Sequence, residues 1–191
     1  MKINLKNKKV LIVGSSKNLG KDLAIKFSNL NCKVTLLSRN KKELTKLHNL
    51  IGGYKKGHEF YPIDLMKNKD LNSEFGKNKA FDIIIHTIGG ALGVNNPLAQ
   101  INDWNEVWRF NVGVSIQINN LFIPKMLKKK WGRIIHVSSI TGEIGEDLGG
   151  PIAYSASKAY LNNYVKSMGK FYAKDNIIIS AVMPGALKSK G

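Results

Sequence analysis

The sequence offers no disulfide bond, no membrane span and no secretion signal. Cys32 is the one cysteine in 191 residues, so no internal disulfide can form, and a free thiol suits a reducing compartment. No uninterrupted apolar run approaches the ~20 residues that a transmembrane helix needs. The apolar run at 10–13 is also shorter than the ~7–15 residues of a signal-peptide core. We therefore expect a cytoplasmic protein that binds no membrane.

Acidic residues are scarce, with 13 Asp and Glu against 30 Lys and Arg, a formal net charge of +17. A surplus of this size is typical of nucleic-acid-binding proteins. The lysines are scattered, however, and their longest run is 128–130; arginine occurs only at Arg39, Arg109 and Arg133. Abundant asparagine and isoleucine indicate the codon usage of an AT-rich genome. We predict that the charge attracts anionic small molecules and not nucleic acid, which remains a third hypothesis.

Apolar segments of strand length recur along the chain, at 8–13, 32–37, 58–63, 81–86, 132–138 and 177–182. Several show little alternation, as parallel strands buried on both faces do. Segments with helical spacing separate them, and one helix is predicted over 102–130, with Asn102 as its N-cap. This order predicts an α/β fold with a doubly wound parallel sheet (Rossmann fold) and the strand order 3-2-1-4-5-6. No repeat or linker divides the chain, so we expect a single domain over 1–191.

A tyrosine and a lysine lie four residues apart in the segment Tyr154-Ser-Ala-Ser-Lys158. On a helix their side chains share one face. A tyrosine titrates near pH ~10, and a neighbouring ammonium lowers its pKa toward the range in which acid–base catalysis is efficient. Ser138 and Ser139 end the preceding apolar run, and a serine hydroxyl there could orient a substrate oxygen. The pattern indicates proton transfer, although Tyr-x-x-x-Lys also arises by chance on surface helices.

Five features in a fixed order resemble the classical short-chain dehydrogenase/reductase family along nearly the whole chain. They are a glycine-rich turn at 14–20, Asn111-Val112, the serines 138–139, Tyr154 with Lys158, and Pro184-Gly185. The resemblance implies an oxidoreductase that uses a nicotinamide cofactor and interconverts a carbonyl group and an alcohol.

The glycine-rich turn follows the first predicted strand and opens a helix, where backbone amides can bind a pyrophosphate. It resembles the family pattern Thr-Gly-x-x-x-Gly-x-Gly, with Val13 in place of Thr and Asn18 in place of the middle Gly. Asparagine tolerates a positive φ, so the turn can be preserved. A tight turn without a ligand is the alternative. The predicted cofactor residues in this turn are Gly14, Ser16, Lys17, Asn18, Leu19 and Gly20.

The end of the second predicted strand favours NADP(H) over NAD(H). No acidic residue stands there to bind the two ribose hydroxyls of NAD. Arg39 offers a planar fork for a 2′-phosphate, Ser38 offers a further donor, and Lys17 occupies a position that is often basic in NADP-preferring relatives. Asp64 and Leu65 resemble the family pair that contacts the adenine amino group.

The fourth predicted strand departs from the family. Its segment Asp82–Gly89 aligns with Asp-x-x-Val-Asn-Asn-Ala-Gly, but His86, Thr87 and Ile88 replace Asn-Asn-Ala. The side-chain hydrogen bonds with which the asparagines brace the central sheet in the family are therefore not predicted for this chain. Gly89 is retained and still permits close approach to the cofactor ribose. Neither His86 nor His136 has a partner at metal-ligand spacing, so no metal site is predicted.

The resemblance also implies a role for each catalytic position. Tyr154 would donate a proton to a substrate carbonyl while NADPH delivers hydride, and Lys158 would bind the nicotinamide ribose and lower the pKa of Tyr154. Ser139, or alternatively Ser138, would hydrogen-bond the carbonyl oxygen. Asn111 would hold a water that links Lys158 to solvent.

The carboxyl-terminal part is expected to complete the cofactor site. By resemblance, Pro184 and Gly185 would close over the nicotinamide, and Ser189 would contact its carboxamide. Relatives continue through a helical flap and a seventh strand, so we expect 1–191 to lack both. The substrate stays open among 3-oxoacyl thioesters, sugar derivatives and small ketones. A truncated, catalytically weak nucleotide-binding protein is the alternative.

A homodimer is the predicted assembly. In relatives the helices that correspond to 102–130 and 152–174 pack against a partner subunit. Here these helices carry large aromatic side chains that we assign to the core or to a subunit contact: Trp104, Trp108, Phe171 and Tyr172.

Overall fold

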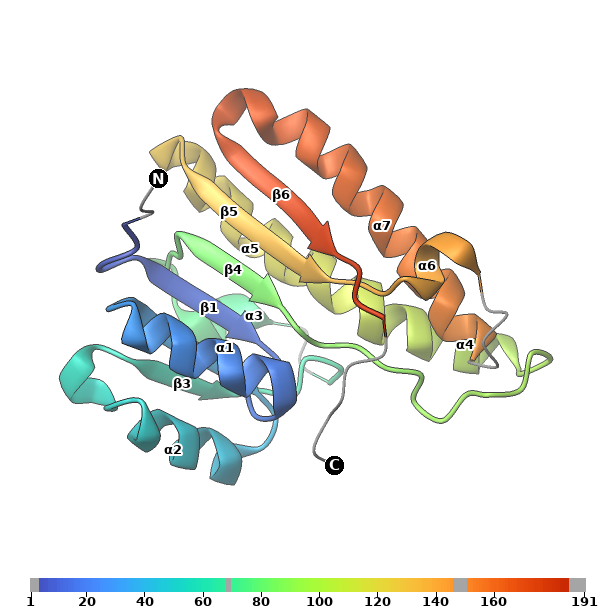
Figure 1. The fold of residues 1–191 in the computed structure, drawn as a ribbon, viewed down its shortest axis with the longest axis horizontal. Coiled ribbons are helices and arrows are strands. Elements are labelled where there is room, and N and C mark those ends of the chain that lie inside the picture. Colours follow the sequence, from blue (N-terminus) through green and yellow to red (C-terminus); the bar gives the residue numbers. More distant parts are fainter. Residues whose placement is uncertain (1–3, 68–69, 146–150, 186–191) are drawn as a thin grey trace.

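Six parallel strands form one sheet in the order β3-β2-β1-β4-β5-β6, which confirms the predicted order (Figure 1). The computed structural model describes residues 4–67, 70–145 and 151–185. The strands are β1 (Lys9–Val13), β2 (Lys33–Ser38), β3 (Glu59–Pro62), β4 (Ile83–His86), β5 (Gly132–Val137) and β6 (Ile177–Val182). Each lies within one of the apolar segments found in the sequence or extends it by a single residue.

Helices cover both faces of the sheet. Figure 1 shows α1 (Asn18–Asn29) and α2 (Lys41–Leu50) on one face, with α5 (Val114–Lys129) and α7 (Ile152–Tyr172) on the other. The remaining helical segments are α3 (Leu71–Phe75), α4 (Ile101–Trp108), α6 (Thr141–Ile144), the 3₁₀ turns η1 (Tyr54–Lys56) and η3 (Ala173–Asp175), and the π-helical turn η2 (Arg109–Gly113). None of the helices in the described ranges is long and apolar enough to cross a bilayer.

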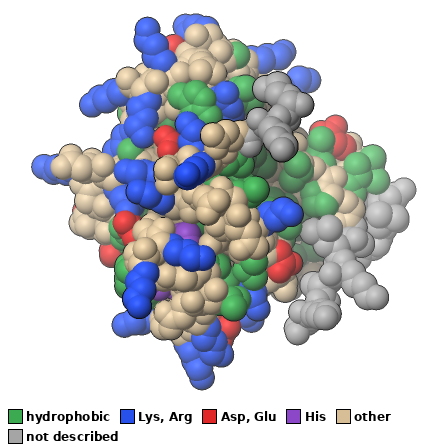
Figure 2. Space-filling model, turned by 60° about the vertical axis from the view of Figure 1, so that its left-hand side comes forward, with side chains coloured by type: hydrophobic (Ala, Val, Ile, Leu, Met, Phe, Trp, Pro, Cys, Tyr) green, Lys and Arg blue, Asp and Glu red, His purple; other side chains and the backbone are tan. Residues whose placement is uncertain are grey.

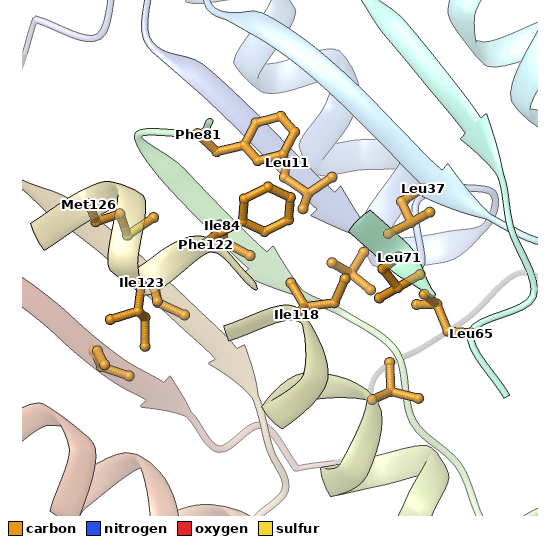
Figure 3. Close-up of a cluster of buried hydrophobic side chains, with 14 of the residues drawn as sticks. Leu11, Leu37, Leu65, Leu71, Phe81, Ile84, Ile118, Phe122, Ile123 and Met126 are labelled. Atoms are coloured by element: carbon orange, nitrogen blue, oxygen red, sulfur yellow. The ribbon is translucent and has the colours of Figure 1, made fainter. Parts of the chain in front are cut away.

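Alternation along β1 divides the hydrophobic core into two clusters. Leu11 and Val13 join the cluster beneath α5, which Figure 3 shows around Phe81 and Phe122. Val10 and Ile12 join the other cluster, beneath α1 and α2. These four residues of β1 are fully buried, as expected of a central parallel strand covered on both sides.

The helix predicted over 102–130 differs in two respects. It begins at Ile101 with Gln100 at the N-cap, so Asn102 lies inside the first turn and the predicted cap is wrong. The π-helical turn at Arg109–Gly113 then separates α4 from α5. Single π turns of this kind within α-helices are frequent at functional sites. This one contains Asn111.

Lysine and arginine side chains are dispersed over the face in Figure 2, with few acidic side chains between them. This distribution agrees with the scatter of lysines along the sequence.

Candidate active site

The predicted cofactor residues gather at one edge of the sheet because parallel strands end at the same edge. The glycine-rich turn follows β1, Ser38 ends β2, and Asp64 comes after β3. Gly89 follows β4, which is the neighbour of β1 on its other side. Successive strands are added on one side of β1 up to β3 and on its other side from β4 onward. An open α/β sheet forms its ligand-binding crevice at this switch point, between β1 and β4.

The glycine-rich turn has the backbone of an anion-binding loop. Gly14 has φ +89° and Asn18 has φ +44°, so asparagine does adopt the positive φ that the pattern required. A Cβ on Gly20 would lie 2.3 Å from the Gly14 oxygen, so only glycine fits there. In the described structure no side chain caps the first turn of α1 after Lys17, the N-cap. Its amide groups are therefore suited to an anion.

Thr87 braces this turn, a role that sequence reasoning missed. Its hydroxyl donates to the Val13 oxygen at 2.8 Å, and the Gly14 oxygen lies 3.2 Å away. Thr87 Oγ1 would also be 2.8 Å from a Cβ on Gly20. Where the family pattern has an asparagine, threonine therefore supplies hydrogen bonds of its own.

A pocket beside the turn has the position of a nucleotide site. Five predicted residues line it with Leu37, Ile63, Met66, Ile88 and Phe110; the five are Gly14, Ser38, Arg39, Asp64 and Leu65. The additional lining is mainly apolar, as suits the faces of an aromatic base. Each of the five additional residues is a chain neighbour of a predicted site residue, and this adjacency is the only signal for them in the sequence.

Polar groups are arranged around the rim of this pocket. Ser38 donates its hydroxyl to the Ser16 hydroxyl at 2.9 Å, which joins the end of β2 to the glycine-rich turn. One oxygen of Asp64 accepts from the Met66 amide at 3.0 Å. Arg39 is exposed and forms no ion pair with any described residue. Its guanidinium is therefore available to an anionic ligand, and Lys17 is exposed as well.

Lys158 is buried at the end of the sheet, with 2% of its surface exposed. Its Nζ donates to the Val137 oxygen at 3.1 Å. Burial lowers the pKa of the ammonium to about 8. A Cβ on Gly89 would lie 2.9 Å from this Nζ and 2.8 Å from Asn111 Oδ1, so a side chain at Gly89 would fill the space between them.

Tyr154 lies beside Lys158 on α7, as the spacing predicted. Lys158 Nζ is 5.5 Å from the centroid of the Tyr154 ring. A short chain of contacts leads from there to Ser139: Ser155 Oγ donates to the Thr141 oxygen at 2.7 Å, and Thr141 Oγ1 donates to Ser139 Oγ at 3.1 Å. The amino end of α7 is thereby held next to the serine at the end of β5.

Asn111 is fully buried and clamps the loop after β4. Its Oδ1 accepts from the Gly90 amide at 3.0 Å, and its Nδ2 lies 2.8 Å from both the Gly90 and Val107 oxygens. The contacts therefore assign it to loop positioning, and the predicted bond to a water remains a prediction.

Pro184 lies beside the end of β5, because its oxygen accepts from the Ile140 amide at 3.1 Å. Gly185 follows it with nothing within 4 Å of the position of a Cβ. Ser189 lies outside the described residues.

Comparison with known proteins gives concordant results. A family model described as short chain dehydrogenase matches residues 8–191. A curated relative, the 3-oxoacyl-[acyl-carrier-protein] reductase FabG of Aquifex aeolicus, is 29% identical over 99% of this chain and 77% of its own length. The fold is similar to that of a Shigella flexneri short chain dehydrogenase complexed with NADP, with a TM-score of 0.84, 22% identity, and coverage of 99% of this chain and 82% of that one. It is also similar to L-sorbose reductase of Gluconobacter frateurii complexed with NADPH and L-sorbose, with a TM-score of 0.85, 23% identity, and coverage of 100% and 73%.

Proposed function

The chain belongs to the short chain dehydrogenase family of oxidoreductases, and from this we propose that it uses NADPH to reduce a carbonyl group to an alcohol. The observation that carries the proposal is the buried Lys158 ammonium beside Tyr154, at the same edge of the sheet as the glycine-rich turn. Proton transfer and nucleotide binding would then occur next to each other.

The residues around the turn fit nicotinamide adenine dinucleotide phosphate. The glycines leave the space that a pyrophosphate needs, and the first turn of α1 offers amide donors. Arg39, without a carboxylate partner among the described residues, suits a 2′-phosphate, and Ser38 and Lys17 add donors beside it. The pocket lined by Leu37, Ile63 and their neighbours suits the adenine ring.

Tyr154 is the proposed proton donor. NADPH, when bound, supplies the hydride for the carbonyl carbon. Tyr154 gives its proton to the carbonyl oxygen, which produces the alcohol and leaves a phenolate. The Lys158 ammonium stabilises that phenolate, since an opposite charge nearby favours the ionised form. Ser139 orients the carbonyl oxygen; Ser138 suits this less, because its Oγ lies 3.5 Å from the Lys158 backbone oxygen on α7.

The substrate is a small carbonyl compound: a 3-oxoacyl thioester, a sugar derivative or a small ketone. The printed name of the Aquifex relative makes a 3-oxoacyl thioester the first compound to test. NADPH consumption should be followed with one substrate of each kind, with Tyr154→Phe as the inactive control. Tight NADPH binding with no turnover on any of them would favour the alternative, a catalytically weak nucleotide-binding protein.

A homodimer through α4, α5 and α7 remains our prediction for the assembly. Trp108 on α4 and Tyr160 on α7 pack edge to face at 5.7 Å, yet 38% and 50% of their surfaces are exposed. Phe171 on α7 is 62% exposed. Covering such a surface favours association. Sedimentation with NADPH present should give a dimer, and Trp108→Glu should shift it toward the monomer.

A further inference from the structure

Asn119 on α5 is the centre of a buried group of polar side chains that joins α5 to three other elements. Its Oδ1 lies 3.0 Å from His86 Nε2 on β4, and its Nδ2 lies 3.3 Å from His136 Nε2 on β5. The same Nδ2 donates to the Tyr164 hydroxyl on α7 at 3.1 Å. We call these four residues the Asn119 cluster. Asn119 and both histidines are almost completely inaccessible to solvent.

The two histidine rings are held in one arrangement. His86 and His136 are register partners on β4 and β5, and their rings stack 4.4 Å apart at 9°. Because one side of the Asn119 amide accepts and the other donates, one ring presents Nε2–H and the other a bare Nε2. Turning the amide over exchanges the two roles and leaves them complementary. Burial lowers the pKa of His86 to about 4 and that of His136 well below its usual range, so both rings are neutral at neutral pH.

The Asn119 cluster stabilises the fold less than apolar side chains would at the same positions. The Nδ1 atoms of both histidines find no hydrogen-bond partner among the described residues. Unsatisfied buried polar atoms reduce stability, and apolar side chains of similar volume would avoid that loss. Exceptions of this kind occur preferentially near functional sites.

The cluster lies directly behind the candidate catalytic groups. His86 precedes the loop of Gly89, and His136 precedes Val137, whose oxygen receives Lys158 Nζ. Tyr164 belongs to α7, the helix of Tyr154 and Lys158. The charge of Lys158 reaches the cluster, since it contributes to the lowered pKa of His136 along with burial and His86. From β6, His136 faces the uncharged Ala181.

We propose that Asn119 is a positioning residue, which ties β4, β5 and α7 together and so holds Lys158 Nζ at the Val137 oxygen, beside Tyr154. The catalytic consequence rests on the function proposed above; the placement of Lys158 does not. Without the hydrogen bonds of Asn119, α7 can shift against β5. This shift exposes Lys158 to solvent and increases the distance between Tyr154 and Ser139.

Two substitutions remove part or all of the hydrogen bonds that Asn119 makes. Tyr164→Phe deletes one hydroxyl and leaves the ring in place, so it should fold. Asn119→Leu removes every hydrogen bond that Asn119 makes and keeps the number and branching of the side-chain heavy atoms. Ser28→Ala is the matched control: it deletes a buried hydroxyl, bonded to the Ile51 oxygen at 3.1 Å and close to His58 Nε2 at 3.0 Å, on the opposite face of the sheet.

Turnover is the first measurement. Tyr164→Phe should lower kcat about fivefold, the effect of one hydrogen bond, with the dissociation constant of NADPH unchanged. Asn119→Leu should lower kcat at least about tenfold, while Ser28→Ala should keep kcat even where it lowers Tm. Unchanged kcat in both cluster variants, or a fall in all three variants that follows Tm, overturns the proposal.

The titration of Lys158 is the second measurement and needs no substrate. Lysine 13Cε signals, assigned with Lys158→Arg, should show a midpoint near 8 in the unmutated protein and in Ser28→Ala. In Tyr164→Phe and Asn119→Leu the midpoint should move up toward the ordinary value of 10.5 as the ammonium gains solvent. An unchanged midpoint in both refutes the positioning role. If the unmutated protein reduces no carbonyl compound, the proposed function fails, and this titration alone decides on Asn119.

Discussion

Acidification should destabilise the protein through its buried histidines, and His86 allows the size of the effect to be worked out. Burial lowers the pKa of His86 to about 4, from an ordinary value of 6.5 that the unfolded chain retains. Between pH ~4 and pH ~6.5, His86 is protonated in the unfolded chain and neutral in the folded protein. The contribution of His86 to stability is therefore complete above pH ~6.5 and is lost as the pH falls toward ~4.

The magnitude follows from the difference between the two pKa values. About 2.5 units at ~1.36 kcal/mol each give roughly 3 kcal/mol of unfolding free energy. His136 acts in the same direction, because burial, His86 and Lys158 all lower its pKa. A loss of this size is a large part of the unfolding free energy of a typical domain, ~5–15 kcal/mol.

Urea unfolding between pH 7 and pH 4 is the assay, with His86→Asn as the comparison. For each protein, the unfolding free energy at each pH is compared with its own value at pH 7. The effect of the substitution on stability at pH 7 then cancels, and so does the titration of the carboxylates that both proteins share. From pH 6.5 to pH 4 the unmutated protein should lose about 3 kcal/mol more than the variant. Parallel curves would refute the reasoning, because they would mean that His86 binds its proton equally well in the folded and unfolded states.

The preference for NADPH should be narrowed or inverted in Arg39→Asp, since a lost charged hydrogen bond to phosphate costs about 1.5–3 kcal/mol; equal dissociation constants for NADPH and NADH in the unmutated protein would contradict the assignment. Tyr154→Phe should abolish turnover and leave NADPH binding nearly normal, whereas Lys158→Ala should damage both; substantial activity in the phenylalanine variant would identify a different proton donor. In the unmutated protein kcat should fall as the pH rises through about 8, where Lys158 loses the charge that stabilises the phenolate, and a rate independent of pH up to 10 would count against this. Gly20→Ala should eliminate NADPH binding in calorimetry, because its Cβ would lie 2.3 Å from the Gly14 oxygen, and an unaltered affinity would disprove the proposed cradle.

The sheet was predictable because its determinants are local or general. Six apolar segments gave the strands, and the right-handed crossover rule together with the family resemblance gave their order. Asn18 was predictable in the same way, since few residues other than glycine accept its φ of +44°. The i, i+4 spacing of Tyr154 and Lys158 likewise predicted that both lie on one face of a helix, which is α7.

The interruption of the helix at 109–113 was not predictable from the apolar pattern, because its cause is a tertiary contact. Asn111 turns inward to bind both backbone groups of Gly90, and the chain accommodates this with a π-helical turn. The periodicity of side chains on either side continues as if one helix ran through. The N-cap predicted at Asn102 was also misplaced, since the helix begins at Ile101 and no side chain caps it in the described structure.

The fourth strand gives the most instructive difference between pattern and structure. His86 and Thr87 each replace an asparagine of the family pattern, so the pattern alone predicts no side-chain hydrogen bond from either position. In the structure Thr87 hydrogen-bonds the turn after β1, and His86 reaches Asn119 on α5. Asn119 and Tyr164 carry no signal in the sequence, since a polar residue within a helix resembles any surface position until its partners arrive from distant segments. Hydrogen bonds that begin at the end of β4 therefore reach the turn after β1 through Thr87 and, through Asn119, reach α7, the helix of Tyr154 and Lys158.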